Sequence, residues 1–119
     1  MKKFLISSLL IFISANGQAQ CKIASVKEGP SRLEVNDEKG FSLTYVQWDG
    51  KDVYDYSSCW LGVVQKLSGT IYVFLYDGSR NTAQKTVQFS SGNAKSIKII
   101  GNKVKVLYDN GREELKDIN

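Results

Sequence analysis

The sequence predicts an all-β protein, a single small antiparallel barrel or sandwich of about 8–10 short strands. Three observations support this class. Segments of strand length are rich in Val, Ile, Thr, Tyr and Phe, which favour strands, and turn-forming residues separate them. The only proline, Pro30, lies in one of these turns. No stretch has a helical period, apart from one short turn that residues 112–118 could form as an alternative to a strand.

Residues 1–19 are expected to be a secretory signal peptide. Two lysines lead into an apolar run over residues 4–13, and small side chains precede Ala19. The run is shorter than the roughly 20 residues that a membrane span needs. Residues 20–119 are then expected to be a single β-rich domain, which places the protein in the periplasm or outside the cell.

The charge is too nearly balanced for a dedicated nucleic-acid binder. The chain has 16 Lys and Arg against 12 Asp and Glu, and loss of Lys2 and Lys3 leaves 14 against 12, a net charge of +2. Nucleic-acid-binding domains are usually far more basic. We therefore expect no nucleic-acid partner.

The two cysteines are expected to form a disulfide. An exported chain with only Cys21 and Cys59 can pair them in one way. Closing that loop would stabilise the fold by roughly 4 kcal/mol in the chain-entropy model. Lipid attachment at Cys21 is the alternative, but the preceding residues, Gln18-Ala19-Gln20, lack the expected leucine three positions upstream.

The first half of the domain contains five strand-like segments. Turn residues divide them at Gly29-Pro30, at residues 36–40 and at Asp49-Gly50. The predicted strands are 22–27, 31–36, 41–48, 52–56 and 59–66.

The next two predicted strands are 70–76 and 84–90. The first, TIYVFLY, is apolar on both faces. Such a strand is central or has its outer face covered by another element. The alternative is that part of its outer face binds a partner.

The last three predicted strands are 95–100, 103–108 and 112–116. Gly101-Asn102 joins the first two and fits a two-residue type II′ or I′ turn. Alternation predicts that four aliphatic residues face inward: Ile97, Ile99, Val104 and Val106. It places Lys98, Lys103 and Lys105 on the outer face, where lysines discourage edge pairing or meet an acidic partner.

The residue inventory argues against an enzyme. Histidine is absent, which removes the commonest general base and a common neutral metal ligand. The expected disulfide removes both thiols, and no glycine-rich phosphate loop is present. We expect no catalytic residues, no cofactor and no metal site.

The most unusual stretch is 46–60, VQWDGKDVYDYSSCW, which combines aromatic and acidic residues. Rigid aromatic rings supply many interface hot spots. We expect a partner-binding loop formed by Trp48, Asp49, Asp52, Tyr54, Asp55 and Tyr56. The alternatives are that these tyrosines and Trp60 are core, that the aspartates bind calcium, or that the aromatics stack on sugars.

The predicted function is binding. In size, compartment and β-content the chain is similar to small periplasmic lysozyme inhibitors and to immunity proteins. The Ser-Gly, Tyr and Trp motif of the lysozyme-inhibitor barrels is not at matching positions, so no family is assigned. We expect an inhibitor or immunity protein whose acidic loop blocks an envelope-acting enzyme or toxin. The alternative is a barrel or sandwich that binds a carbohydrate or a small apolar ligand.

Overall fold

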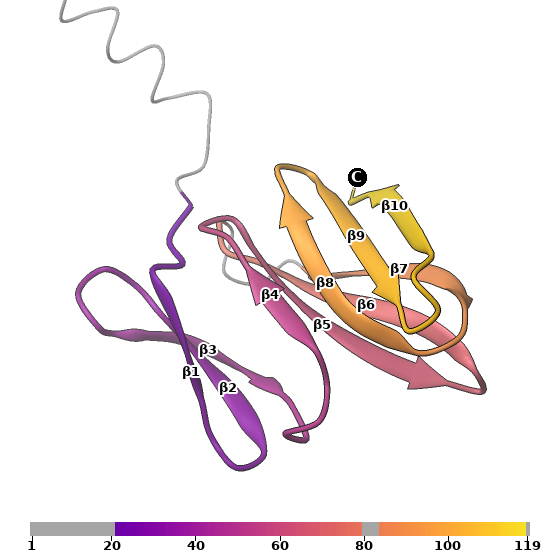
Figure 1. The fold of residues 1–119 in the computed structure, drawn as a ribbon. Helices are drawn as coiled ribbons and strands as arrows, with labels where there is room; N and C mark the ends of the chain where they lie inside the picture. The colour runs from indigo at the N-terminus through magenta and orange to yellow at the C-terminus, as the bar shows by residue number, and fades with distance from the viewer. Residues whose placement is uncertain (1–20, 80–83, 119) are drawn as a thin grey trace, which may run out of the picture.

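The computed structural model describes residues 21–79 and 84–118, and this part of the chain is all β (Figure 1). The predicted signal peptide lies outside the described residues. Each of the ten predicted strands is confirmed, with ends shifted by a few residues. The strands are β1 (Ser25–Glu28), β2 (Arg32–Asn36), β3 (Ser42–Gln47), β4 (Tyr54–Tyr56), β5 (Trp60–Leu67), β6 (Thr70–Asp77), β7 (Gln84–Ser91), β8 (Ala94–Ile100), β9 (Lys103–Tyr108) and β10 (Glu113–Asp117).

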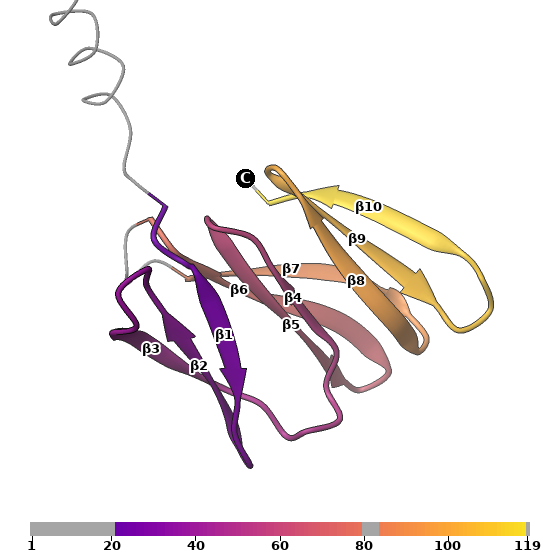
Figure 2. The same cartoon turned by 60° about the vertical axis from the view of Figure 1, so that its left-hand side comes forward.

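The strands form three antiparallel sheets rather than a closed barrel. The strand orders are β1-β2-β3, β4-β5-β6-β7 and β10-β9-β8. The four-stranded sheet lies between the other two, which makes a sandwich of three layers (Figures 1 and 2). The sandwich is therefore the form that the structure takes.

Each face of the central sheet has its own core. Leu61 and Val63 of β5 pack with Leu33 and Val35 of β2 in one buried cluster. On the opposite face, residues of β5 and β6 pack against β8 and β9, and this second cluster also takes in Phe89 and Tyr108. Its aliphatic members on these four strands are Val64, Ile71, Val73, Leu75, Ile97, Ile99, Val104 and Val106.

The double coverage explains the strand that is apolar on both faces. Within β6, Val73 and Leu75 belong to the core beneath β8 and β9, whereas Tyr76 belongs to the core beneath β1–β3. Because side chains alternate between the faces of a strand, β6 needs apolar residues in both sets. β6 is therefore the central strand that the sequence predicts, with β5 and β7 on its two sides, and its face toward β1–β3 is covered in part, because Tyr72 and Phe74 are half-buried.

The β8–β9 hairpin has the predicted turn. Ile100 pairs with Lys103, so Gly101 and Asn102 are the two turn residues. Gly101 has φ 59° and Asn102 does not share that positive φ, which fits type II′ rather than I′. All four of the aliphatic side chains predicted to face inward are buried.

The predicted disulfide is present and fastens the first sheet to the central one. Cys21 and Cys59 are bonded, with Cα atoms 4.7 Å apart. Beside it, the Lys22 N–H donates to the Gly78 carbonyl and the Ile23 N–H to the Ser58 carbonyl, both at 3.1 Å. The bond agrees with an oxidising location.

Side chains connect the central sheet to β8–β10 along both edges. On one side, the Asp55 carboxylate of β4 accepts the Ile99 N–H of β8 at 2.9 Å. On the other, Glu114 of β10 accepts the Ser90 N–H of β7 at 3.2 Å, and Lys116 donates to the Gln88 carbonyl at 2.7 Å. We call these contacts the Asp55 bridge and the Glu114–Lys116 bridge. They satisfy outward-facing backbone groups of β8 and β7.

Residues 113–117 form β10, so the short helical turn considered for this region is not the structure it adopts. No helix in residues 21–79 and 84–118 has the length and apolar character of a membrane span.

Candidate partner-binding loop

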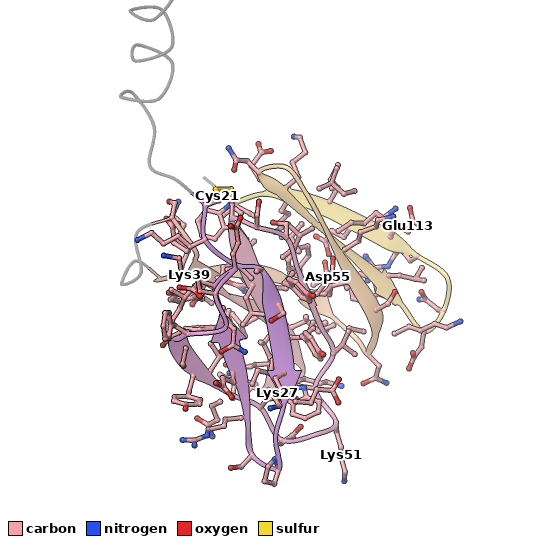
Figure 3. All side chains as sticks on the ribbon, turned by 90° about the vertical axis from the view of Figure 1, so that its left-hand side faces the viewer. Cys21, Lys27, Lys39, Lys51, Asp55 and Glu113 are labelled. Carbon is pink, nitrogen blue, oxygen red and sulfur yellow. A yellow bond between two sulfur atoms is a disulfide. The ribbon has the colours of Figure 1, made fainter. Side chains whose placement is uncertain are left out.

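The predicted loop lies on the connection between β3 and β4 and on β4 itself. Its six residues sit close together in the sequence, but their side chains point in different directions. Tyr54 and Asp55 are neighbours in β4 and therefore face opposite sides of the central sheet. Figure 3 views this side of the molecule, with Asp55 between β1–β3 and β8–β10 and Lys51 at the exposed tip.

Trp48 packs beneath the loop and stabilises its conformation. Its side chain is 8% exposed and packs in the core under β1–β3. The indole N–H donates to the Asp52 carbonyl at 2.8 Å, and the ring meets Tyr54 edge to face with centroids 5.9 Å apart. Trp48 therefore fixes the loop conformation rather than offering a ring to solvent.

Asp49 closes the tight turn at the tip. Its carboxylate accepts the Lys51 and Asp52 N–H groups, each at 2.8 Å. Gly50 has φ 85°, a conformation that favours glycine. Hydrogen bonds from the two backbone N–H groups hold the pKa of Asp49 below its ordinary value, so its carboxyl stays ionised. The residue is also exposed to solvent.

Asp52 is half-buried beside Asp49. Burial, followed by the neighbouring charge of Asp49, raises the pKa of the Asp52 carboxyl. The two carboxyl groups therefore make an acidic tip whose second member is the easier one to protonate.

Tyr54 links β4 to the end of β1. Its hydroxyl donates to a Glu28 carboxylate oxygen at 2.7 Å. Burial, and then the hydrogen bond to Glu28, raise the pKa of Tyr54 to about 12. The phenol therefore stays protonated at physiological pH and holds the loop against β1.

Asp55 and Tyr56 complete the predicted set. Asp55 is occupied by its bridge to Ile99. The Tyr56 ring is 39% exposed and is therefore the most accessible aromatic of the predicted loop. Trp60, considered as a core residue, is buried, and its indole N–H donates to the Asn102 side chain at 3.3 Å.

A surface hollow of about 440 Å³ lies beside the loop. Trp48, Asp49 and Asp52 line it together with Gln65 and Lys66 of β5. No group of three His, Cys, Asp or Glu side chains among the described residues is arranged to hold a metal ion, so the calcium alternative gains no support.

The predicted lysine cluster lies on β8 and β9, in another sheet than the loop, on the face opposite the buried Ile97, Ile99, Val104 and Val106. Lys103 pairs with Asp117 at 2.6 Å and Lys105 with Glu113 at 3.7 Å. The cluster is therefore partly neutralised and separate from the loop.

Sequence reasoning did not single out the aromatic residues of the β2–β3 hairpin. Phe41 is 67% exposed, and Tyr45 is 49% exposed with the Arg32 guanidinium 3.9 Å from its ring centre. The sequence feature that could have identified this hairpin is the composition of Ser42–Gln47, which has strong strand formers and no charged residue.

Comparison of the chain with protein-family models, with curated proteins and with solved structures finds no match.

Proposed function

We propose that the protein is an exported binding protein, an inhibitor or immunity protein that blocks an enzyme or toxin acting on the cell envelope. The contact surface is the tip of the β3–β4 connection together with Tyr56. Trp48, Tyr54 and Asp55 act as the supports of that surface.

The observation that supports this proposal best is the set of hydrogen bonds that holds the acidic tip. Trp48 bonds the Asp52 carbonyl, Asp49 bonds two backbone N–H groups, and Cys59 anchors the segment after β4. A loop that is ordered before binding loses little conformational entropy in the complex. An ionised, exposed Asp49 suits a basic cleft, such as one that normally holds an anionic polymer, and the exposed Tyr56 ring at the end of β4 adds apolar contact area.

Two features support an exported location: the sequence of the first 19 residues and the disulfide. A basic start, an apolar run and small residues before Ala19 are typical of a signal peptide that directs export. A chain with a disulfide between Cys21 and Cys59 needs an oxidising compartment to keep it.

A pull-down tests this function. The purified protein is incubated with the native envelope fraction at low and high salt, and the bound proteins are identified by mass spectrometry. One stoichiometric hydrolase or toxin is the expected result, with binding weakened by salt. Bound glycan or lipid without a protein partner would instead favour the ligand-binding alternative.

Tyr56→Ala tests the contact surface in the complex so obtained. We expect affinity to fall by about 2 kcal/mol, the scale of an interface hot spot. Leu115→Ala is the matched control, because Leu115 is an exposed apolar residue on the far sheet. Equal affinity of the Tyr56→Ala and control variants, both folded, would exclude this surface.

A further inference from the structure

The outer edge of β3 has no strand paired to it among the described residues. β3 is the last strand of its sheet, and within this part of the chain it pairs with β2. The Trp48 N–H donates to the Ser31 carbonyl at 3.1 Å, and successive residues of an antiparallel strand turn their backbone groups to alternate sides. In this register Tyr45 and Gln47 direct their N–H and C=O groups away from β2.

Most other edges of the described sheets are protected. The Asp55 bridge covers β8 and the Glu114–Lys116 bridge covers β7. Four of the five residues of β10 are charged, which discourages pairing. Among the ten strands of the described chain, β3 alone carries no charged side chain. An open edge without these protections is suited to pairing with another strand.

The space beside β3 has an apolar floor. The three-stranded sheet covers a four-stranded one, and on the face toward it Tyr72 and Phe74 of β6 are only half-buried. A hollow of about 150 Å³ is lined by residues Tyr45 to Gln47 of β3 together with Gln65 and Phe74. A further strand beside β3 would cover this part of β6.

One end of this space carries two carboxylates, Asp49 and Asp52, and one ammonium group, Lys66. The hollow beneath β3 and the hollow at the acidic tip share Gln47 and Gln65. Asp49, Asp52 and Lys66 line the second hollow. The Lys66 ammonium, which borders it, donates to the Asn93 side chain.

We propose that the β3 edge binds one extended segment of a partner protein by strand addition. Main-chain hydrogen bonds form to Tyr45 and Gln47, and alternate apolar side chains of the segment face Tyr72 and Phe74. A Lys or Arg near the N-terminal end of an antiparallel segment lies beside Asp49. A second copy of this chain fits less well, because its β3 carries no Lys or Arg to lie beside Asp49.

This inference does not depend on the acidic tip entering an enzyme cleft. The edge can bind an extended segment whether or not the protein is an inhibitor. The test therefore uses a defined peptide in place of the envelope partner, so that failure of one proposal leaves the other standing.

The probe is a labelled octapeptide, Lys-Thr-Val-Thr-Val-Thr-Val-Thr, titrated with the purified protein and followed by fluorescence anisotropy. We expect saturable binding that weakens at least tenfold in Tyr45→Pro. This substitution removes an outward N–H that the β2–β3 ladder does not use, and edge strands tolerate proline. Replacing the peptide lysine by glutamate is expected to weaken binding several-fold at low salt, with the difference shrinking as salt rises.

Two variants separate the backbone contribution from other effects. Tyr45→Thr keeps the N–H and removes the ring, so it is expected to retain more binding than Tyr45→Pro. Leu115→Pro places the same change on the outer edge of β10 and is expected to bind like the unmodified protein. Absence of binding by the lysine peptide, equal loss in the two proline variants, or a dimer in solution that Tyr45→Pro dissociates would each overturn the proposal.

Discussion

Two three-stranded sheets cover the same central sheet, and they are attached to it in different ways. The β8–β10 sheet is connected along both edges, by the Asp55 bridge and by the Glu114–Lys116 bridge. The β1–β3 sheet is attached at its β1 side, by the disulfide, by the backbone bonds next to it and by the Tyr54 hydroxyl. Its β3 side has no such connection among the described residues.

The difference shows how one sandwich can combine stability with an available edge. Side chains that satisfy outward backbone groups stabilise β7 and β8 and also stop other strands from pairing there. Among the residues that the structure describes, no such side chain meets the outward backbone groups of β3, so these groups can pair with a partner strand. The connected layer therefore provides rigidity, and the layer attached at one side provides a binding edge.

The largest expected effect comes from removing the disulfide. The double variant Cys21→Ser, Cys59→Ser should lose about 4 kcal/mol of unfolding free energy, because a loop of 38 residues is no longer closed in the unfolded chain. Urea denaturation measures the loss. Hydrogen exchange should accelerate in β1–β3 before it does in β8 and β9, because this bond attaches only the former sheet. Uniform acceleration in both sheets would contradict the comparison.

The next effect comes from the Asp55 bridge. Asp55→Ala should destabilise the fold by about 1–3 kcal/mol, because the Ile99 N–H loses its acceptor within a part-buried contact. Asp55→Asn keeps an acceptor oxygen and should recover part of the loss. Thermal denaturation of the two variants gives the comparison, and equal stabilities would show that Asp55 does not act through this bond.

The smallest of the three effects concerns pH and the second bridge. The Tyr108 hydroxyl and then the Ser90 N–H hold the pKa of Glu114 below its ordinary value of 4.5, despite burial. A carboxyl whose folded pKa is lowered contributes stability above its unfolded pKa and loses it as the pH falls toward the folded value. The free energy of unfolding should therefore decline as the pH falls below about 4.5. In Glu114→Gln this decline should be smaller, because the variant has no carboxyl to protonate at this position.

Glu114→Gln is expected to change the free energy of unfolding less than Asp55→Ala does, because the Ser90 N–H also contacts the Tyr108 hydroxyl at 3.2 Å. Urea denaturation of both proteins between pH 3 and pH 7 measures it. An identical pH dependence of the unfolding free energy in the two proteins would remove Glu114 from the explanation.

Sequence reasoning predicted the strands and the turn at Gly101, because alternation and turn chemistry are local properties. The apolar pattern of 70–76 predicted a covered strand, and the count of two cysteines predicted their bond. The sequence did not predict the individual roles of the loop residues. Alternation shows that Tyr54 and Asp55 face opposite ways, but not that Ile99, 44 residues later, lies beside Asp55. Burial of Trp48 depends likewise on how β1–β3 docks, which local patterns do not encode.

Native-state hydrogen exchange, followed residue by residue by NMR, tests the difference between the two layers most directly. Ile99, Ser90, Tyr45 and Gln47 all direct an amide outward from an edge strand. Slow exchange is predicted for Ile99 and Ser90, whose amides are bonded by Asp55 and by Glu114 and Tyr108. Fast exchange is predicted for Tyr45 and Gln47. Protection of Tyr45 and Gln47 equal to that of Ile99 would show that the β3 edge is already occupied and would contradict the account.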